Sequence, residues 1–154
     1  MIKPVEQPRS GATCVSRVAL VGLIVYVGVL LVLTAAPNPR VPTVAINLVP
    51  TRSITAGIAR GGWLFYVNVI GNILVFVPLG VLLPLVRVRF DHVGSMTLIA
   101  AGSSMLIELL QLVFARRVSD VDDVILNALG ALLGLASYRS IRSVVRLVQR
   151  RAGS

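Results

Sequence analysis

A single carboxylate, Glu108, stands inside a long apolar stretch that runs from residue 93 to residue 114 and is otherwise uncharged. An ionised side chain at membrane depth is costly, so it normally faces protein or water and marks a functional site. A dense polar string follows, made up of Arg116, Arg117, Ser119, Asp120, Asp122, Asp123 and Asn127. Of the six acidic residues in the chain, only Glu6 and Asp91 lie outside the segment from Glu108 to Asp123. Such groups could bind a polar headgroup, or could move a proton through Glu108 or Asp123.

Composition places the chain among membrane proteins. Of its 154 residues, 56% are hydrophobic and 14% are charged, which leaves room for one membrane domain and no second folded unit. The net charge of +9 lies in short segments between apolar runs, without the interleaved aromatic residues that stack bases, so we expect no nucleic-acid partner. The one cysteine, Cys14, cannot form an internal disulfide, and its spacing suggests no metal site. No cofactor is indicated.

Four apolar runs, at residues 18–36, 63–86, 93–114 and 122–138, are long enough to cross a bilayer, although the last is short. They predict an all-α membrane protein, a four-helix transmembrane bundle at 18–138 between an N-terminal segment (1–17) and a basic tail (139–154). The first run could instead be a signal peptide, because Thr34, Ala35 and Ala36 resemble a cleavage site. Its length and the following Pro37 argue against cleavage.

The distribution of cations predicts the orientation of the chain. Ten of the fifteen Lys and Arg residues lie in the N-terminal segment, in the turn after the second span and in the tail. Because Lys and Arg are enriched in cytoplasmic segments, this bias predicts a multi-pass protein of the bacterial cytoplasmic membrane with both termini in the cytoplasm. The segment 37–62 and the turn 115–121 would then lie outside.

The tail shows a helical pattern of its own. Ile141, Val144, Val145 and Val148 share one face, whereas Arg139, Arg142, Arg146 and Arg150 take the opposite face. This pattern predicts a basic amphipathic helix. It would either bind an anionic membrane surface or act only as a positive anchor on the cytoplasmic side.

With this topology, five polar residues fall at similar depth, within about 14 Å of the outer ends of their spans at 1.5 Å per residue. They are Asn68, Asn72, Glu108, Gln111 and Asn127. The helical phase agrees, because Ser104, Glu108 and Gln111 share a stripe of the third span. Asp120, Asp123, Asn127, Gly130 and Gly134 share a face of the fourth. The small residues would let helices approach closely.

Each of these polar residues also has a purely structural interpretation. The amides could be hydrogen-bonding contacts between helices, and Arg116 or Arg117 could neutralise Glu108. Asp120 or Ser119 could cap the fourth span, and Asp122 could simply favour the positive end of that helix. We interpret Asp122 mainly in that way. The candidate binding residues are therefore Asn68, Asn72, Glu108, Gln111, Arg117, Asp120, Asp123 and Asn127.

The sequence resembles the VanZ-like family of small bacterial membrane proteins. Three blocks carry the resemblance: Asn47-Leu-Val-Pro50, the run from Asn68 to Gly80, and the run from Ser104 through Glu108, Arg117 and Asp123 to Gly130. The family takes its name from an accessory protein of a glycopeptide-resistance cluster that is linked to teicoplanin resistance. The resemblance implies a role at the cell envelope, and the characteristic residues of the family coincide with the outer polar cluster.

Two classes of function follow from the resemblance and the cluster. In the first, the pocket recognises a lipid-linked wall precursor or a partner protein and so changes susceptibility to glycopeptides. In the second, a membrane enzyme acts on a lipid headgroup at the outer leaflet, with Glu108 or Asp123 as the acid or base and Arg117 binding phosphate. The sequence does not distinguish them, nor does it give the oligomeric state.

Overall fold

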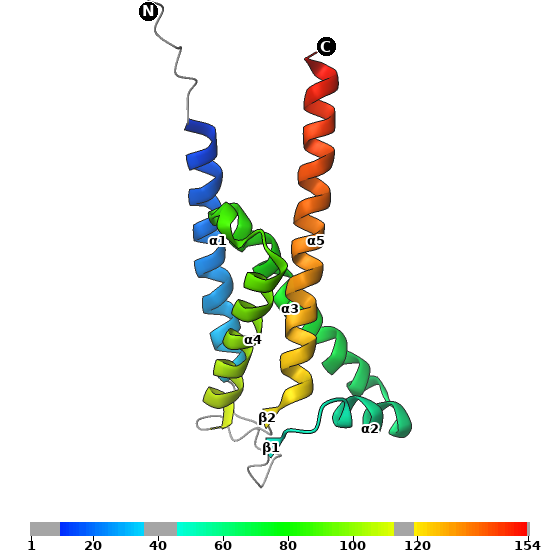
Figure 1. Cartoon of the computed structure of the whole chain (residues 1–154). Coiled ribbons are helices and arrows are strands. Elements are labelled where there is room, and N and C mark those ends of the chain that lie inside the picture. Colours follow the sequence, from blue (N-terminus) through cyan, green and yellow to red (C-terminus); the bar gives the residue numbers. More distant parts are fainter. Residues whose placement is uncertain (1–9, 36–45, 113–118, 154) are drawn as a thin grey trace, which may run out of the picture.

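Four long helices dominate the computed structural model, which describes residues 10–35, 46–112 and 119–153 (Figure 1). They are α1 (Ser10–Ala35), α3 (Trp63–Val86), α4 (Val93–Leu110) and α5 (Val121–Ala152). Each contains a stretch that is long and apolar enough to cross a membrane. The prediction of an all-α, four-helix membrane protein is therefore confirmed.

Three short elements gather at one end of the bundle. They are β1 (Ile46–Asn47), α2 (Arg52–Arg60) and β2 (Ser119–Asp120), and we call this end the loop end. β1 and β2 pair in parallel, with Ile46 opposite Ser119 and Asn47 opposite Asp120. The start of α1 and the end of α5 lie at the opposite end, which we call the terminal end (Figure 1).

The centre of the fold is the contact between α3 and α5, where the two backbones approach closely. A Cβ atom on Gly80 would lie 2.0 Å from the carbonyl oxygen of Ala131, and one on Gly130 would lie 2.0 Å from that of Ile73. Gly134 is equally close to Val77. The close approach expected from Gly130 and Gly134 is thus present, and its partner is α3, which also contains Pro78 and Pro84.

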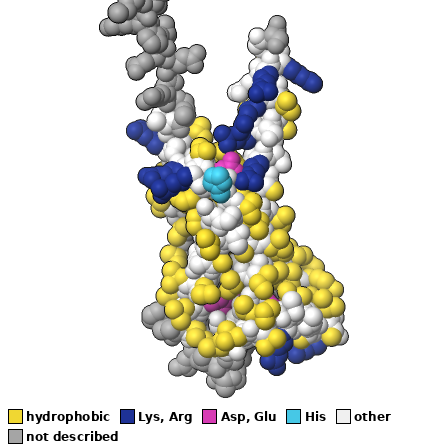
Figure 2. Space-filling view, in the orientation of Figure 1, with side chains coloured by type: hydrophobic (Ala, Val, Ile, Leu, Met, Phe, Trp, Pro, Cys, Tyr) yellow, Lys and Arg dark blue, Asp and Glu magenta, His cyan; other side chains and the backbone are white. Residues whose placement is uncertain are grey.

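At the terminal end, α5 continues without a break through residue 138, so the basic tail is an extension of the fourth span. A short 3₁₀ helix, η1 (Val88–Phe90), joins α3 to α4 beside it. Arg139 Nε donates to Asp91 Oδ1 at 2.6 Å, and Arg142 Nη1 donates to Asp91 Oδ2 at 3.2 Å. Figure 2 shows arginines gathered here and near α2, with hydrophobic side chains between.

We predict that Gly80→Ala destabilises the protein by about 2 kcal/mol or more, because its methyl group would meet the backbone of α5. Gly71→Ala, in the same helix, is the matched control, since nothing lies within 4 Å of its Cβ position. Alanine favours a helix over glycine by about 1 kcal/mol, so the control should be neutral or slightly stabilising. Thermal unfolding in detergent measures both, and equal behaviour of the two variants would contradict the role of Gly80.

Candidate functional site

Glu108 lies on the buried face of α4 and is 6% exposed. Its Oε2 accepts a hydrogen bond of 3.1 Å from the backbone N–H of Asp120. The contact ties the end of α4 to β2, immediately before α5 begins. The isolated carboxylate of the third apolar run therefore has a defined backbone partner at the loop end.

Asp120 is the capping residue of α5. Its Oδ1 accepts from the backbone N–H of Asp122 at 3.0 Å, so of the two candidate caps, Ser119 and Asp120, the structure selects the aspartate. The same carboxylate accepts from Asn47 Nδ2 at 3.0 Å and from the Ser53 hydroxyl. One side chain thus links the start of α5, strand β1 and the start of α2.

Asp122 caps a helix other than its own. Its side chain is 1% exposed, and it accepts from the backbone N–H groups of Thr51 at 2.5 Å, Ser53 at 2.9 Å and Ile54 at 3.1 Å. These are donors at the start of α2 that have no partner within the helix. The sequence interpretation assigned Asp122 to the positive end of α5 and missed this contact, which joins segments about 70 residues apart.

A polar cavity of about 100 Å³ lies between α1, α3, α4 and α5. Its polar lining residues are Asn72, Glu108, Gln111, Asp123 and Asn127. Asn72 Nδ2 donates to Asp123 Oδ1 at 2.5 Å, and Asn127 Nδ2 donates to the hydroxyl of Ser104 at 2.7 Å. Five of the eight candidate binding residues therefore surround one space.

Two of the other three candidates lie outside the polar cavity, and the third is not among the described residues. Asn68 is exposed and does not line the polar cavity. Asp120 is adjacent through its bond to Glu108, but its side chain faces β1 and α2. Arg117, like Arg116, lies outside the described residues, so its phosphate-binding role stays a prediction.

An apolar groove of about 150 Å³ adjoins the polar cavity. The two share Leu30, Phe76 and Ile107 as lining residues. The hydroxyl of Tyr26 in the groove wall is buried, and so is Asn127 Oδ1 at the polar cavity; neither has a hydrogen-bond partner among the described residues. The sequence analysis did not select Tyr26 as a candidate residue. The only sequence feature that indicates it is an isolated phenol within an apolar span.

Comparison with known proteins identifies the family of the chain. The VanZ/LLP1 family profile matches residues 23–143. The chain belongs to the VanZ/LLP1 family. A curated relative, Protein VanZ of Enterococcus faecium, is 36% identical over 73 residues, which cover 46% of this chain and 44% of the relative. No solved structure matches.

Family membership and the four apolar helices identify a multi-pass membrane protein in a lipid bilayer. The polar cavity of this VanZ/LLP1 protein carries two carboxylates and three amides, and no Lys or Arg of the described residues lines it. Carboxylates accept hydrogen bonds and attract cations, so the cavity suits a group that donates, such as a hydroxyl or an ammonium. The groove beside it suits a hydrocarbon chain.

We predict that Asp122→Asn loosens α2 without unfolding the bundle. An amide keeps the volume of the side chain but offers one acceptor oxygen, so some backbone donors of α2 lose their charged partner. Hydrogen exchange at Thr51, Ser53 and Ile54 should accelerate about tenfold or more. Asp91→Asn, at the terminal end, is the control and should leave this exchange unchanged. Normal protection in Asp122→Asn would refute the capping role.

Proposed function

We propose that this VanZ/LLP1 protein binds an amphipathic lipid of the cell envelope, namely a lipid-linked wall precursor. The polar cavity would take a hydrogen-bond donor of the headgroup, and the apolar groove would take the start of the lipid chain. The observation that carries the proposal is the pair of adjoining spaces, each lined by a residue, Asn127 or Tyr26, whose buried Oδ1 or OH atom lacks a partner among the described residues.

Buried polar atoms are nearly always hydrogen-bonded, because leaving one without a partner costs about 1–3 kcal/mol. An amphipathic ligand would satisfy both atoms. It would donate to Asn127 Oδ1 from its polar part and would bring a polar atom near Tyr26 where its chain enters the groove. The polar cavity, at about 100 Å³, has room for one such group and not for a whole saccharide–peptide headgroup. The rest of the headgroup would extend beyond the loop end.

The proposed orientation gives this binding a consequence. With both termini in the cytoplasm, the loop end faces the outer side of the cytoplasmic membrane, where glycopeptides meet wall precursors. Holding a precursor there would change how much of it the antibiotic can reach. The protein would in this way affect susceptibility to teicoplanin-type glycopeptides.

The enzymatic alternative uses the same two carboxylates. Glu108 and Asp123 both line the polar cavity, so either could reach a bound headgroup. However, Glu108 accepts from a backbone N–H that joins α4 to β2, and Asp123 accepts from the amide of Asn72. Both carboxylates therefore already serve the packing of helices, which favours recognition over acid–base catalysis.

Reporter fusions test the orientation. We predict that fusions after Arg52, His92, Ser119 and Ser154 report outside, inside, outside and inside, because the Lys and Arg residues are concentrated on the side of the termini. An external signal at Ser154 would place the loop end in the cytoplasm and would remove the proposed contact with glycopeptides.

Tyr26→Phe tests the ligand. We predict that it weakens retention of a lipid-linked disaccharide–peptide precursor about fivefold, because a hydrogen bond to the hydroxyl is lost. Stability of the lipid-free protein should be unchanged or about 1 kcal/mol higher, since a buried hydroxyl without a partner is removed. Native mass spectrometry and thermal unfolding in detergent measure the two effects.

Tyr66→Phe is the matched control, because Tyr66 is 51% exposed and lines neither space. It should bind the precursor as the wild type does. Equal precursor retention by wild type and Tyr26→Phe would count against a ligand in the groove. Conversion of the bound precursor to a new product, rather than its recovery unchanged, would favour the enzymatic alternative.

A further inference from the structure

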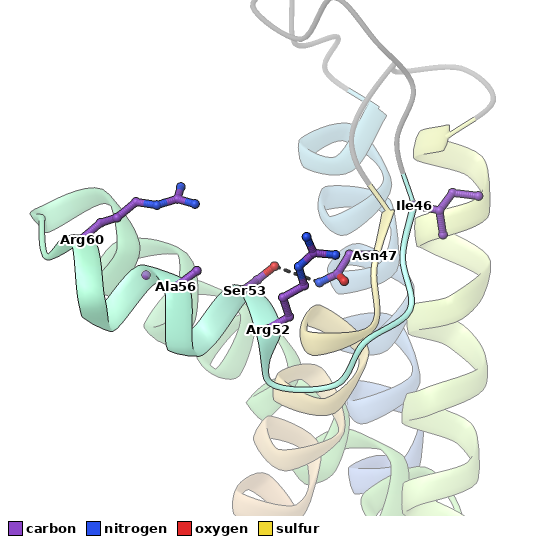
Figure 3. Close-up of a pocket in the computed structure, with 7 residues that line it drawn as sticks. Ile46, Asn47, Arg52, Ser53, Ala56 and Arg60 are labelled. Atoms are coloured by element: carbon purple, nitrogen blue, oxygen red, sulfur yellow. Dashed lines mark hydrogen bonds between the residues drawn. The ribbon is translucent and has the colours of Figure 1, made fainter.

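A separate pocket of about 370 Å³ lies at the loop end, against α2 (Figure 3). Its polar lining residues are Asn47, Arg52, Ser53 and Arg60. None of its lining residues is shared with the polar cavity or the apolar groove. The pocket is therefore distinct from the site proposed above and calls for its own explanation.

The charge of this pocket is positive. Figure 3 shows the side chains of Arg52 and Arg60 on the same side of α2, with Arg60 extending toward the Arg52 end of the helix. The ion pairs found among the described residues involve Asp91 with Arg139 and Arg142, and neither Arg52 nor Arg60 takes part in one. Among the described residues, no carboxylate lines the pocket. Two guanidinium groups thus border a space with no anion of their own.

Two described carboxylates at the loop end already have partners. Asp120 accepts hydrogen bonds from Ser53 and Asn47 of the pocket lining, and Asp122 accepts from the backbone N–H of Ser53 at the start of α2. Because Asp122 already offsets the positive end of α2, the helix dipole does not supply the attraction for an anion. That attraction rests on the two arginines.

Two contacts hold α2 in place so that its arginines are positioned. Asp122 fixes the start of the helix through three backbone donors. Near the other end, the ring of Phe65 from α3 lies against Gly57, where a Cβ atom would be 2.1 Å from Phe65 Cδ2. Arg52 and Arg60 are therefore carried by an anchored helix and not by a free loop.

The pocket lies at the level of lipid headgroups. α2 leads directly into α3, whose first residues include Trp63 and Tyr66, at 77% and 51% exposure. Exposed Trp and Tyr at the end of a membrane helix mark the boundary between hydrocarbon and water. A guanidinium group at that depth meets the phosphates of the leaflet and can bind them through paired hydrogen bonds.

We propose that the α2 pocket is a phosphate-binding site in which Arg52 and Arg60 hold one phosphate group. The phosphate would belong to a lipid headgroup or to a free phosphate anion, because both offer the same oxygens. This site goes beyond the lipid recognition proposed for the polar cavity, and it is tested through different residues.

The test uses the full chain in a neutral detergent, titrated with phosphatidylglycerol and with diacylglycerol as the phosphate-free lipid, and followed by native mass spectrometry. We expect at least tenfold tighter binding of phosphatidylglycerol. Arg52→Gln and Arg60→Gln should each weaken it about tenfold, because each removes a charge-assisted contact. Inorganic pyrophosphate as competitor separates the sources: displacement of the lipid shows that free phosphate suffices, whereas retention assigns the site to a lipid phosphate.

Arg17→Gln is the matched control, since it removes the same charge from an exposed position in the first half of α1, away from the loop end. It should bind phosphatidylglycerol within about twofold of the wild type, as expected for a charge outside the site. An equal loss in Arg17→Gln would mean that net charge alone attracts the lipid and would overturn the site. Unchanged binding in the Arg52→Gln/Arg60→Gln double variant would overturn it as well, and circular dichroism checks that the variants keep their helices.

Discussion

The loop end depends on backbone donors being satisfied by carboxylate side chains. Within or next to a bilayer, an N–H group without a partner cannot rely on water, so helix ends near the membrane need dedicated acceptors. Asp122 supplies them for α2, and Asp120 supplies one for α5 while also binding Asn47 and Ser53. The acidic residues that suggest catalysis in the sequence therefore serve first to connect helices. The sites at this end lie next to them.

Close packing between α3 and α5 explains where the open spaces lie. Gly80, Gly130 and Gly134 bring the two backbones together, so little side-chain volume is needed between them. The larger side chains of α3, such as Phe76 and Leu79, face α1 and α4 instead. The polar cavity and the apolar groove lie along the boundary of α3 with α1 and α4. There the helices meet through their side chains and not through their backbones.

Much of the fold, and part of the site, follows from local sequence signals. Apolar length predicts the four helices, and helical phase with common depth predicts that Asn72, Glu108 and Asn127 surround one space. Asn68 does not line this space because the first part of α3, beside α2, inclines away from the bundle (Figure 1). An argument from helical phase does not include such an inclination. The contact of Asp122 with α2 joins segments that are distant in the sequence, so no periodic pattern of residues indicates it. The arginine pocket depends on this contact and was therefore not predicted from the sequence.

The two sites at the loop end have opposite charge and are joined by hydrogen bonds. Asn47 and Ser53 line the arginine pocket and bond the carboxylate of Asp120, whose backbone N–H bonds Glu108 in the lining of the polar cavity. A side-chain substitution at Asp120 would remove the bonds to Asn47 and Ser53, whereas the backbone N–H that bonds Glu108 would remain. Tyr26 and Arg60 stand outside these hydrogen bonds, and each borders one space only. An acidic cavity beside a hydrocarbon groove and a separate cationic pocket are complementary to different parts of a phosphate-bearing amphipathic lipid, since hydroxyls or amines suit the first and phosphate suits the second.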